Sequence, residues 1–174
     1  MIIKELKDED FVNYKKPSMF IGFPTCSFKC CKEGNLPIEI CQNCDLIKIS
    51  GIEISPEQIV ERFLSNPITS AIVIGGMEPF DSFSDLLSLI STLRQHTSCD
   101  CVIYSGYTKE ELENGWLYQE NRNSNTRRMA YEWLKTFPNI IVKFGRFIPN
   151  QQSHYDEVLG VKLISNNQYA ERVS

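Results

Sequence analysis

The chain has 174 residues, of which 42% are hydrophobic and 23% are charged, and its formal net charge is −4. This length suits a single domain spanning residues 1–174, with a core at about residues 18–168, and such a domain can bury about two-thirds of its unfolded surface. The acidic balance argues against a nucleic-acid or membrane-surface binder, because no basic field would attract phosphate groups.

The first sixteen residues are crowded with charge, and no apolar segment typical of a signal peptide follows them. No apolar run is long enough to span a bilayer. We therefore expect a cytoplasmic protein. In that reducing compartment, clustered cysteines more often bind metal or catalyse than form disulfides.

Apolar runs predict buried strands at residues 18–23, 71–75, 101–104, 139–144 and 160–164. Capping boxes at Ser55 with Gln58 and at Thr108 with Glu111 predict helix starts, and apolar periodicity predicts helices at residues 84–95 and 126–137. Residues 115–125 lack this periodicity and are expected to form an exposed insertion. The alternation of strands and helices predicts an α/β fold, as a partial (open) βα barrel of about five mostly parallel strands or a doubly wound sheet.

Five of the seven cysteines lie within one polar segment after the first predicted strand: Cys26, Cys30, Cys31, Cys41 and Cys44. Isolated free cysteines are usually small buried hydrophobes, as we expect for Cys99 and Cys101, but five on one polar loop predict a metal site. Soft thiolates select iron–sulfur clusters or zinc. Zinc sites often use two Cys-x2-Cys pairs, whereas only Cys41 and Cys44 form such a pair and no histidine lies near them.

Further motifs follow the other predicted strands, at the edge of a parallel sheet where ligands gather. They are Gly75-Gly76-Met77-Glu78-Pro79, Ser105-Gly106-Tyr107, Gly145-Arg146 and Asn166-Asn167-Gln168. Glycines allow close approach of the backbone to a ligand, and the carboxylate and amide side chains offer hydrogen bonds.

The cysteine segment resembles the Cys-x3-Cys-x2-Cys signature of the radical S-adenosylmethionine superfamily. Cys26 and Cys30 match its first half, and an insertion displaces the third cysteine. The preferred ligand set is Cys26, Cys30 and Cys41, because Cys41-Gln42-Asn43 is similar to the motif of anaerobic ribonucleoside-triphosphate reductase activating proteins. The alternative set, Cys26, Cys41 and Cys44, matches the Cys-x14-Cys-x2-Cys spacing of some 7-carboxy-7-deazaguanine synthases.

The strand-end motifs resemble the same superfamily in the same order. Gly75 to Pro79 is similar to its Gly-Gly-Glu-Pro motif with Met77 added, and residues 141–147 are similar to a segment that ends in Asp-Gly-Arg-Phe, with Phe144 in place of the acid. The resemblance implies that S-adenosylmethionine is bound by five residues: Gly75, Gly76, Glu78, Ser105 and Asn167.

The resemblance also implies a function. Three thiolates would hold a [4Fe–4S] cluster whose open iron binds S-adenosylmethionine, and reductive cleavage would yield a 5′-deoxyadenosyl radical. The expected partners are a glycyl-radical enzyme, such as anaerobic ribonucleotide reductase, and an electron donor of flavodoxin or ferredoxin type. Two alternatives stay open: a small-molecule radical enzyme resembling 7-carboxy-7-deazaguanine synthase, and a non-catalytic module that binds zinc or a cluster.

Overall fold

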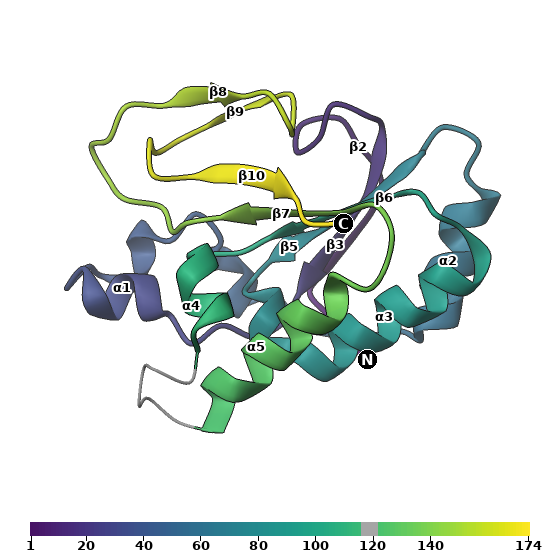
Figure 1. Ribbon diagram of the computed structural model, residues 1–174, viewed down its shortest axis with the longest axis horizontal. Helices are drawn as coiled ribbons and strands as arrows, with labels where there is room; N and C mark the ends of the chain where they lie inside the picture. Colours follow the sequence, from purple (N-terminus) through teal and green to yellow (C-terminus); the bar gives the residue numbers. More distant parts are fainter. Residues whose placement is uncertain (116–121) are drawn as a thin grey trace.

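The computed structural model describes residues 1–115 and 122–174, with residues 122–125 described by their backbone alone. A six-stranded sheet in the order β10-β7-β6-β5-β3-β2 forms its centre (Figure 1). The four inner strands are parallel to one another, and the two edge strands are antiparallel to their neighbours. The strands are β2 (Glu5–Asp10), β3 (Ser18–Phe23), β5 (Ala71–Gly76), β6 (Asp100–Tyr104), β7 (Ile140–Phe144) and β10 (Tyr169–Arg172).

Helices cover one face of this sheet, below it in Figure 1. They are α2 (Pro56–Ser65), α3 (Phe83–His96), α4 (Lys109–Glu113) and α5 (Arg122–Leu134). Alternate strand residues such as Ile72 and Ile74 point toward these helices and form the larger core cluster with them. The residues between them, such as Val73, face the opposite side, as the two-residue period of a strand requires.

The opposite face is covered by a two-stranded antiparallel ribbon of β8 (His154–Asp156) and β9 (Val161–Leu163). Tyr14, Leu159 and Leu163 close a second, smaller core cluster beneath it. The cysteine segment lies at the carboxyl ends of the inner strands (Figure 1). This segment contains α1 (Lys29–Glu33) and two short 3-10 helices, η1 (Ile38–Ile40) and η2 (Cys44–Ile47).

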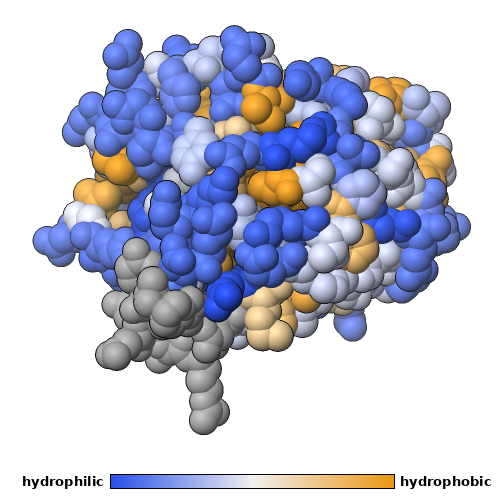
Figure 2. Space-filling model, viewed as in Figure 1, coloured by the Kyte–Doolittle hydropathy of each residue, from blue (hydrophilic) through white to orange (hydrophobic). Residues whose placement is uncertain are grey.

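Short elements complete the fold: β1 (Ile2–Ile3), which pairs with β4 (Ile52–Glu53), and the 3-10 helix η3 (Pro79–Ser82). No helix in the described part of the chain is long and apolar enough to cross a membrane. Figure 2 shows a mostly hydrophilic face with separate hydrophobic patches, an ordinary protein surface.

The prediction of an α/β fold with a mostly parallel sheet is confirmed, and the open barrel stays a prediction. Both capping boxes are present, with Ser55 and Thr108 each accepting the backbone N–H three residues later. Helix α5 begins at Arg122 rather than at the expected Thr126. The exposed insertion expected at residues 115–125 lies mostly outside the described residues.

Residues 160–164 were expected to add a strand to the central sheet, and this placement was wrong. This segment forms a strand, but it pairs with β8 because the turn at residues 157–160 folds it back. Gly160 adopts φ +71° there, and the Asp156 carboxylate accepts the N–H of Leu159 at 2.8 Å. The sheet is instead completed at its edges by β10 and β2. The charged residues of β2 are tolerated there because one side of an edge strand is open.

Candidate functional site

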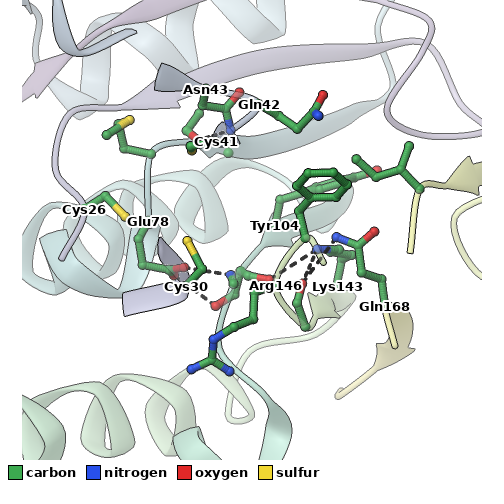
Figure 3. Close-up of a pocket in the computed structure, with 18 of the residues that line it drawn as sticks. Cys26, Cys30, Cys41, Gln42, Asn43, Glu78, Tyr104, Lys143, Arg146 and Gln168 are labelled. Carbon is green, nitrogen blue, oxygen red and sulfur yellow. Dashed lines mark hydrogen bonds between the residues drawn. The ribbon is translucent and has the colours of Figure 1, made fainter. Parts of the chain in front are cut away.

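A cavity of about 430 Å³ lies at the carboxyl ends of the inner strands. Cys26, Cys30, Cys31 and Cys41 line it, and Figure 3 shows three of these thiols among the lining side chains. Cys44 is not part of this lining, and its Sγ lies 3.9 Å from the Glu39 carbonyl oxygen. The structure therefore brings four of the five clustered cysteines to one cavity.

The Sγ atoms of Cys30 and Cys31 lie 3.9 Å apart, and Figure 3 shows Cys26 and Cys41 at other points around the cavity. Within the described residues, no group of three or more His, Cys, Asp or Glu side chains is close enough to hold a metal ion. A cubane cluster carries its thiolates on separate iron atoms, so its ligands lie farther apart than those of a single zinc ion. Soft donors distributed around a cavity thus fit a cluster better than one ion.

Three thiols of this segment, those of Cys26, Cys31 and Cys41, hold their protons strongly. Burial, with a contribution from the charges of Glu78 and Asp81, raises the pKa of Cys26 to about 12, and burial together with the neighbouring thiols raises that of Cys31 to about 11. Burial likewise raises the pKa of Cys41. Metal ligation requires thiolates, so binding must displace these protons and would be driven by the metal charge.

Asp81, on η3, anchors the backbone next to Cys26. Its carboxylate accepts the N–H of Ser27 at 2.6 Å and the hydroxyl of Tyr107 at 2.9 Å. The guanidinium of Arg127, on α5, forms an ion pair with this carboxylate at 2.7 Å. Side chains from two distant elements therefore hold the start of the cysteine segment in place.

Glu111, on α4, anchors α1, the helix that contains Cys30. Its carboxylate lies 2.7 Å from Arg146 and 3.0 Å from Lys29, and Arg146 also lies 2.8 Å from Glu33. Burial opposes ionisation of Glu111, but the hydrogen bond from Arg146 and the other partners hold its pKa below its usual range. Because Lys29 and Glu33 flank Cys30, this network sets the position of that thiol.

Glu78 is a buried carboxylate at the end of β5. It accepts hydrogen bonds from the N–H of Gly106 at 2.7 Å, from the hydroxyl of Ser105 at 2.9 Å and from the N–H of Phe80 at 3.2 Å. Burial and the nearby charge of Asp81 raise its pKa to about 7. Three donors thus fix the orientation of the one acidic group in the glycine motif.

Glycine is required at position 76 of this turn. Gly76 adopts φ +77°, and a Cβ there would lie 2.8 Å from the Cα of Gly22 on the neighbouring strand. Its carbonyl accepts a hydrogen bond from the side-chain amide of Asn43. The added Met77 is accommodated by a backbone bond to Phe23 at 3.2 Å.

Four of the five residues expected to bind S-adenosylmethionine line the cavity: Gly75, Gly76, Glu78 and Ser105. Asn167 does not line it, and its amide donates to the Arg146 carbonyl at 2.9 Å while its neighbour Gln168 lines the cavity.

Sequence reasoning missed Lys143 and Tyr104, which also line the cavity. The sequence signal that could have identified Lys143 was its position as a lysine within an otherwise apolar strand, β7.

Residues 19–154 match the family model described as a 4Fe-4S single cluster domain. This range contains all five clustered cysteines and, apart from Ser18, the four parallel strands. Comparisons with curated proteins and with solved structures gave no match.

Proposed function

Since the chain belongs to the family of 4Fe-4S single cluster domains, it is an iron–sulfur protein, and we propose that it cleaves S-adenosylmethionine to a 5′-deoxyadenosyl radical. The observation that carries this proposal is the shared cavity, which Cys26, Cys30 and Cys41 line together with the glycine motif. When bound, the cluster supplies the electron that breaks the sulfonium bond. The residues of the chain would ligate the cluster, orient S-adenosylmethionine and exclude water.

We propose Cys26, Cys30 and Cys41 as the cluster ligands. All three line the cavity, whereas Cys44, required by the alternative set, does not. The Glu111 network supports this set further, because it anchors Lys29, the residue next to Cys30. The fourth iron would then be free for the amino and carboxylate groups of S-adenosylmethionine.

The glycine turn would receive the ammonium group of the cofactor. The backbone at Gly75 and Gly76 approaches the cavity without side chains, and the carboxylate of Glu78 adds a charged acceptor. The Gly76 carbonyl already accepts one hydrogen bond, from the side-chain amide of Asn43. Ser105 orients this carboxylate, because its hydroxyl donates a hydrogen bond to Glu78 at 2.9 Å.

For the hydrogen-atom donor we propose a glycyl-radical enzyme, such as anaerobic ribonucleotide reductase, with a flavodoxin- or ferredoxin-type protein as electron donor. Two lining residues are apolar and exposed, Val12 at 72% and Ile164 at 43%, and the adjacent Phe11 is 61% exposed. Exposed apolar residues at a cavity mouth suit the docking of another polypeptide. A second candidate, an enzyme acting on a small acidic molecule, is favoured by the buried Lys143 on the cavity wall.

The test is anaerobic reconstitution of the full chain with iron and sulfide, followed by reduction with dithionite and addition of S-adenosylmethionine. We expect about four irons per chain and formation of methionine and 5′-deoxyadenosine, measured by chromatography. A reconstituted cluster that yields no 5′-deoxyadenosine would contradict the radical proposal while leaving the iron–sulfur assignment intact.

A further inference from the structure

Cys26 accepts a hydrogen bond from its own segment of the chain. The backbone N–H of Phe28 donates to the Sγ of Cys26 at 3.3 Å, and Cys26 lines the cavity (Figure 3). Cys26 belongs to both candidate ligand sets, so its proposed role does not depend on the choice between Cys30 and Cys44. The donor of this bond is therefore held beside a sulfur that both sets assign to the cluster.

Phe28 makes this bond from a backbone conformation that residues with a side chain rarely adopt. Its φ is +53° and its ψ is +33°, in the left-handed region. Its carbonyl accepts the N–H groups of Cys31 and Lys32, each at 3.1 Å, and thereby begins α1. Phe28 thus points its N–H at Cys26 and its carbonyl at the helix that contains Cys30. Such a conformation persists only where the surrounding structure holds it.

Ser27, between Cys26 and Phe28, is held through both its backbone and its side chain. Its N–H donates to Oδ2 of Asp81 at 2.6 Å, and its Oγ lies 3.0 Å from Oη of Tyr107. Tyr107 donates its only hydroxyl proton to Oδ1 of Asp81 at 2.9 Å, so the Ser27 hydroxyl must be the donor to Tyr107. These bonds close a ring that fixes Ser27 against one carboxylate.

The partners of Ser27 are fixed in turn. Tyr107 is 4% exposed, and its N–H donates to Oγ of Ser105 at 3.0 Å. The guanidinium of Arg127 lies 4.7 Å from the centroid of the Tyr107 ring, and its Nε donates to Asp81 at 2.8 Å. Although Tyr107 lines the cavity, its hydroxyl proton is already used on Asp81. The hydroxyl is therefore placed to hold Ser27 rather than to donate to a ligand.

A hydrogen bond to a cysteine sulfur changes the electronic properties of an attached cluster. Hydrogen bonds to the sulfurs are among the factors that set the reduction potential of iron–sulfur clusters. Donation stabilises the reduced form more than the oxidised form, because the reduced form carries more negative charge. An N–H fixed in the direction of Cys26 would thus raise the potential of a cluster attached there.

We propose that Ser27 and Tyr107 are positioning residues, which direct the Phe28 N–H to the sulfur of Cys26 and so raise the reduction potential of the bound cluster. This inference rests on the proposed ligation by Cys26. It does not depend on S-adenosylmethionine or on the hydrogen-atom donor. Asp81 is left unchanged in the tests, because removal of its charge would shift the potential by itself.

The first test uses the metal-free full chain under reducing, anaerobic conditions and measures exchange of the Phe28 amide proton by NMR. Tyr107→Phe and Ser27→Ala each remove one hydroxyl of the ring of hydrogen bonds. We expect each variant to speed this exchange by about threefold to tenfold, the value of one hydrogen bond. Tyr131→Phe, which removes the hydroxyl of another buried tyrosine, is the matched control and should exchange as the wild type does.

The second test is a redox titration of the anaerobically reconstituted chain, followed by electron paramagnetic resonance. We expect the midpoint potential to shift to more negative values in Tyr107→Phe and Ser27→Ala and to stay unchanged in Tyr131→Phe. Iron content shows whether each variant holds its cluster, and Ser27→Ala carries the comparison if Tyr107→Phe does not. If neither variant holds a cluster, the exchange of the Phe28 amide decides, and an unchanged rate overturns the proposal.

An unchanged potential in both variants overturns the proposal even where amide exchange is faster, because the hydroxyls would then only brace the segment. A shift of equal size in Tyr131→Phe overturns it as well. The potential is measured separately from cofactor cleavage, so the two proposals fail separately. The expected shifts without formation of 5′-deoxyadenosine overturn the radical function alone, and cleavage with unchanged potentials overturns this inference alone.

Discussion

Glu78 shows how one carboxylate is prepared for a cationic ligand. A buried carboxylate costs free energy unless its oxygens accept hydrogen bonds, and here Ser105, Gly106 and Phe80 supply the donors. The donors fix its orientation before any ligand arrives. The positive sulfonium and ammonium groups of S-adenosylmethionine are suitable partners for its charge.

Replacement of Glu78 by Gln should weaken the binding of S-adenosylmethionine by about tenfold to hundredfold, because a charge-assisted hydrogen bond is lost. Calorimetry on the reconstituted protein measures this change. Glu61→Gln, on the exposed side of α2, is the control and should bind as the wild type does. An unchanged dissociation constant for Glu78→Gln would rule out a contact with the cofactor.

Cys30 and Cys44 distinguish the two ligand sets. Cys30 lines the cavity and Cys44 does not, so Cys30→Ala should lose most of the bound iron, and Cys44→Ala should keep it. Iron and sulfide content, with the absorption spectrum, is the measurement. The reverse pattern would establish Cys26, Cys41 and Cys44 as the ligands.

At the scale of elements, α1 depends on the rest of the fold for its position. It has only five residues, Phe28 before it adopts φ +53°, and no side chain caps its N-terminus. Such a short helix is not stable by itself. The ion pairs from α1 to Glu111 and Arg146 therefore hold it over the strand ends.

Replacement of Glu111 by Gln should loosen α1, because Lys29 and Arg146 lose their shared carboxylate. Gln preserves the capping box with Thr108, so α4 should remain intact. We expect the free energy of unfolding to fall by about 1–2 kcal/mol and the retained iron to decrease after gel filtration. Glu110→Gln, exposed on the same helix, is the matched control, and equal iron retention in both variants would contradict the anchoring role.

At the scale of the whole molecule, Asp100 joins three distant parts of the chain. Its carboxylate bonds to Tyr14 at 2.9 Å, to Lys16 at 2.5 Å and to Arg172 at 2.8 Å. Although burial opposes ionisation, these partners lower its pKa to about 2. The N-terminal segment, the start of β6 and the last strand are thereby held together.

Because the pKa of Asp100 is lower in the folded state than the ordinary value near 3.9, its contribution is complete above about pH 4. This contribution, about 2 kcal/mol, should be lost as the pH falls from about 4 toward 2. Asp100→Asn should lower stability by about this amount at pH 7 and should flatten that part of the pH profile, as measured by urea unfolding.

Asp8→Asn is the control, since the pair of Asp8 with Arg62 is exposed and should change stability by no more than about 0.5 kcal/mol. Equal stability of Asp100→Asn and the wild type at every pH would show that the Asp100 network does not contribute.

Much of this organisation was predictable from local sequence. Apolar runs located the four parallel strands, and capping boxes at Ser55 and Thr108 located two helix starts, because both signals depend on residues close together in the chain. The edge strand β2 escaped prediction because its charges obscure the strand pattern. Helix α5 was placed too late because its first turn lacks apolar residues.

The sequence by itself determined the crowded thiols, the glycine turn with Glu78 and the parallel core, since short spacings and apolar runs carry these features. Only the tertiary structure decided that Cys30 lines the cavity and Cys44 does not, that Glu111 anchors α1, and that β9 pairs with β8. It also decided that Lys143, an isolated lysine in a strand, is a buried cation on the cavity wall. The physical reason is that burial, ion pairing and strand pairing are set by residues far apart in the chain.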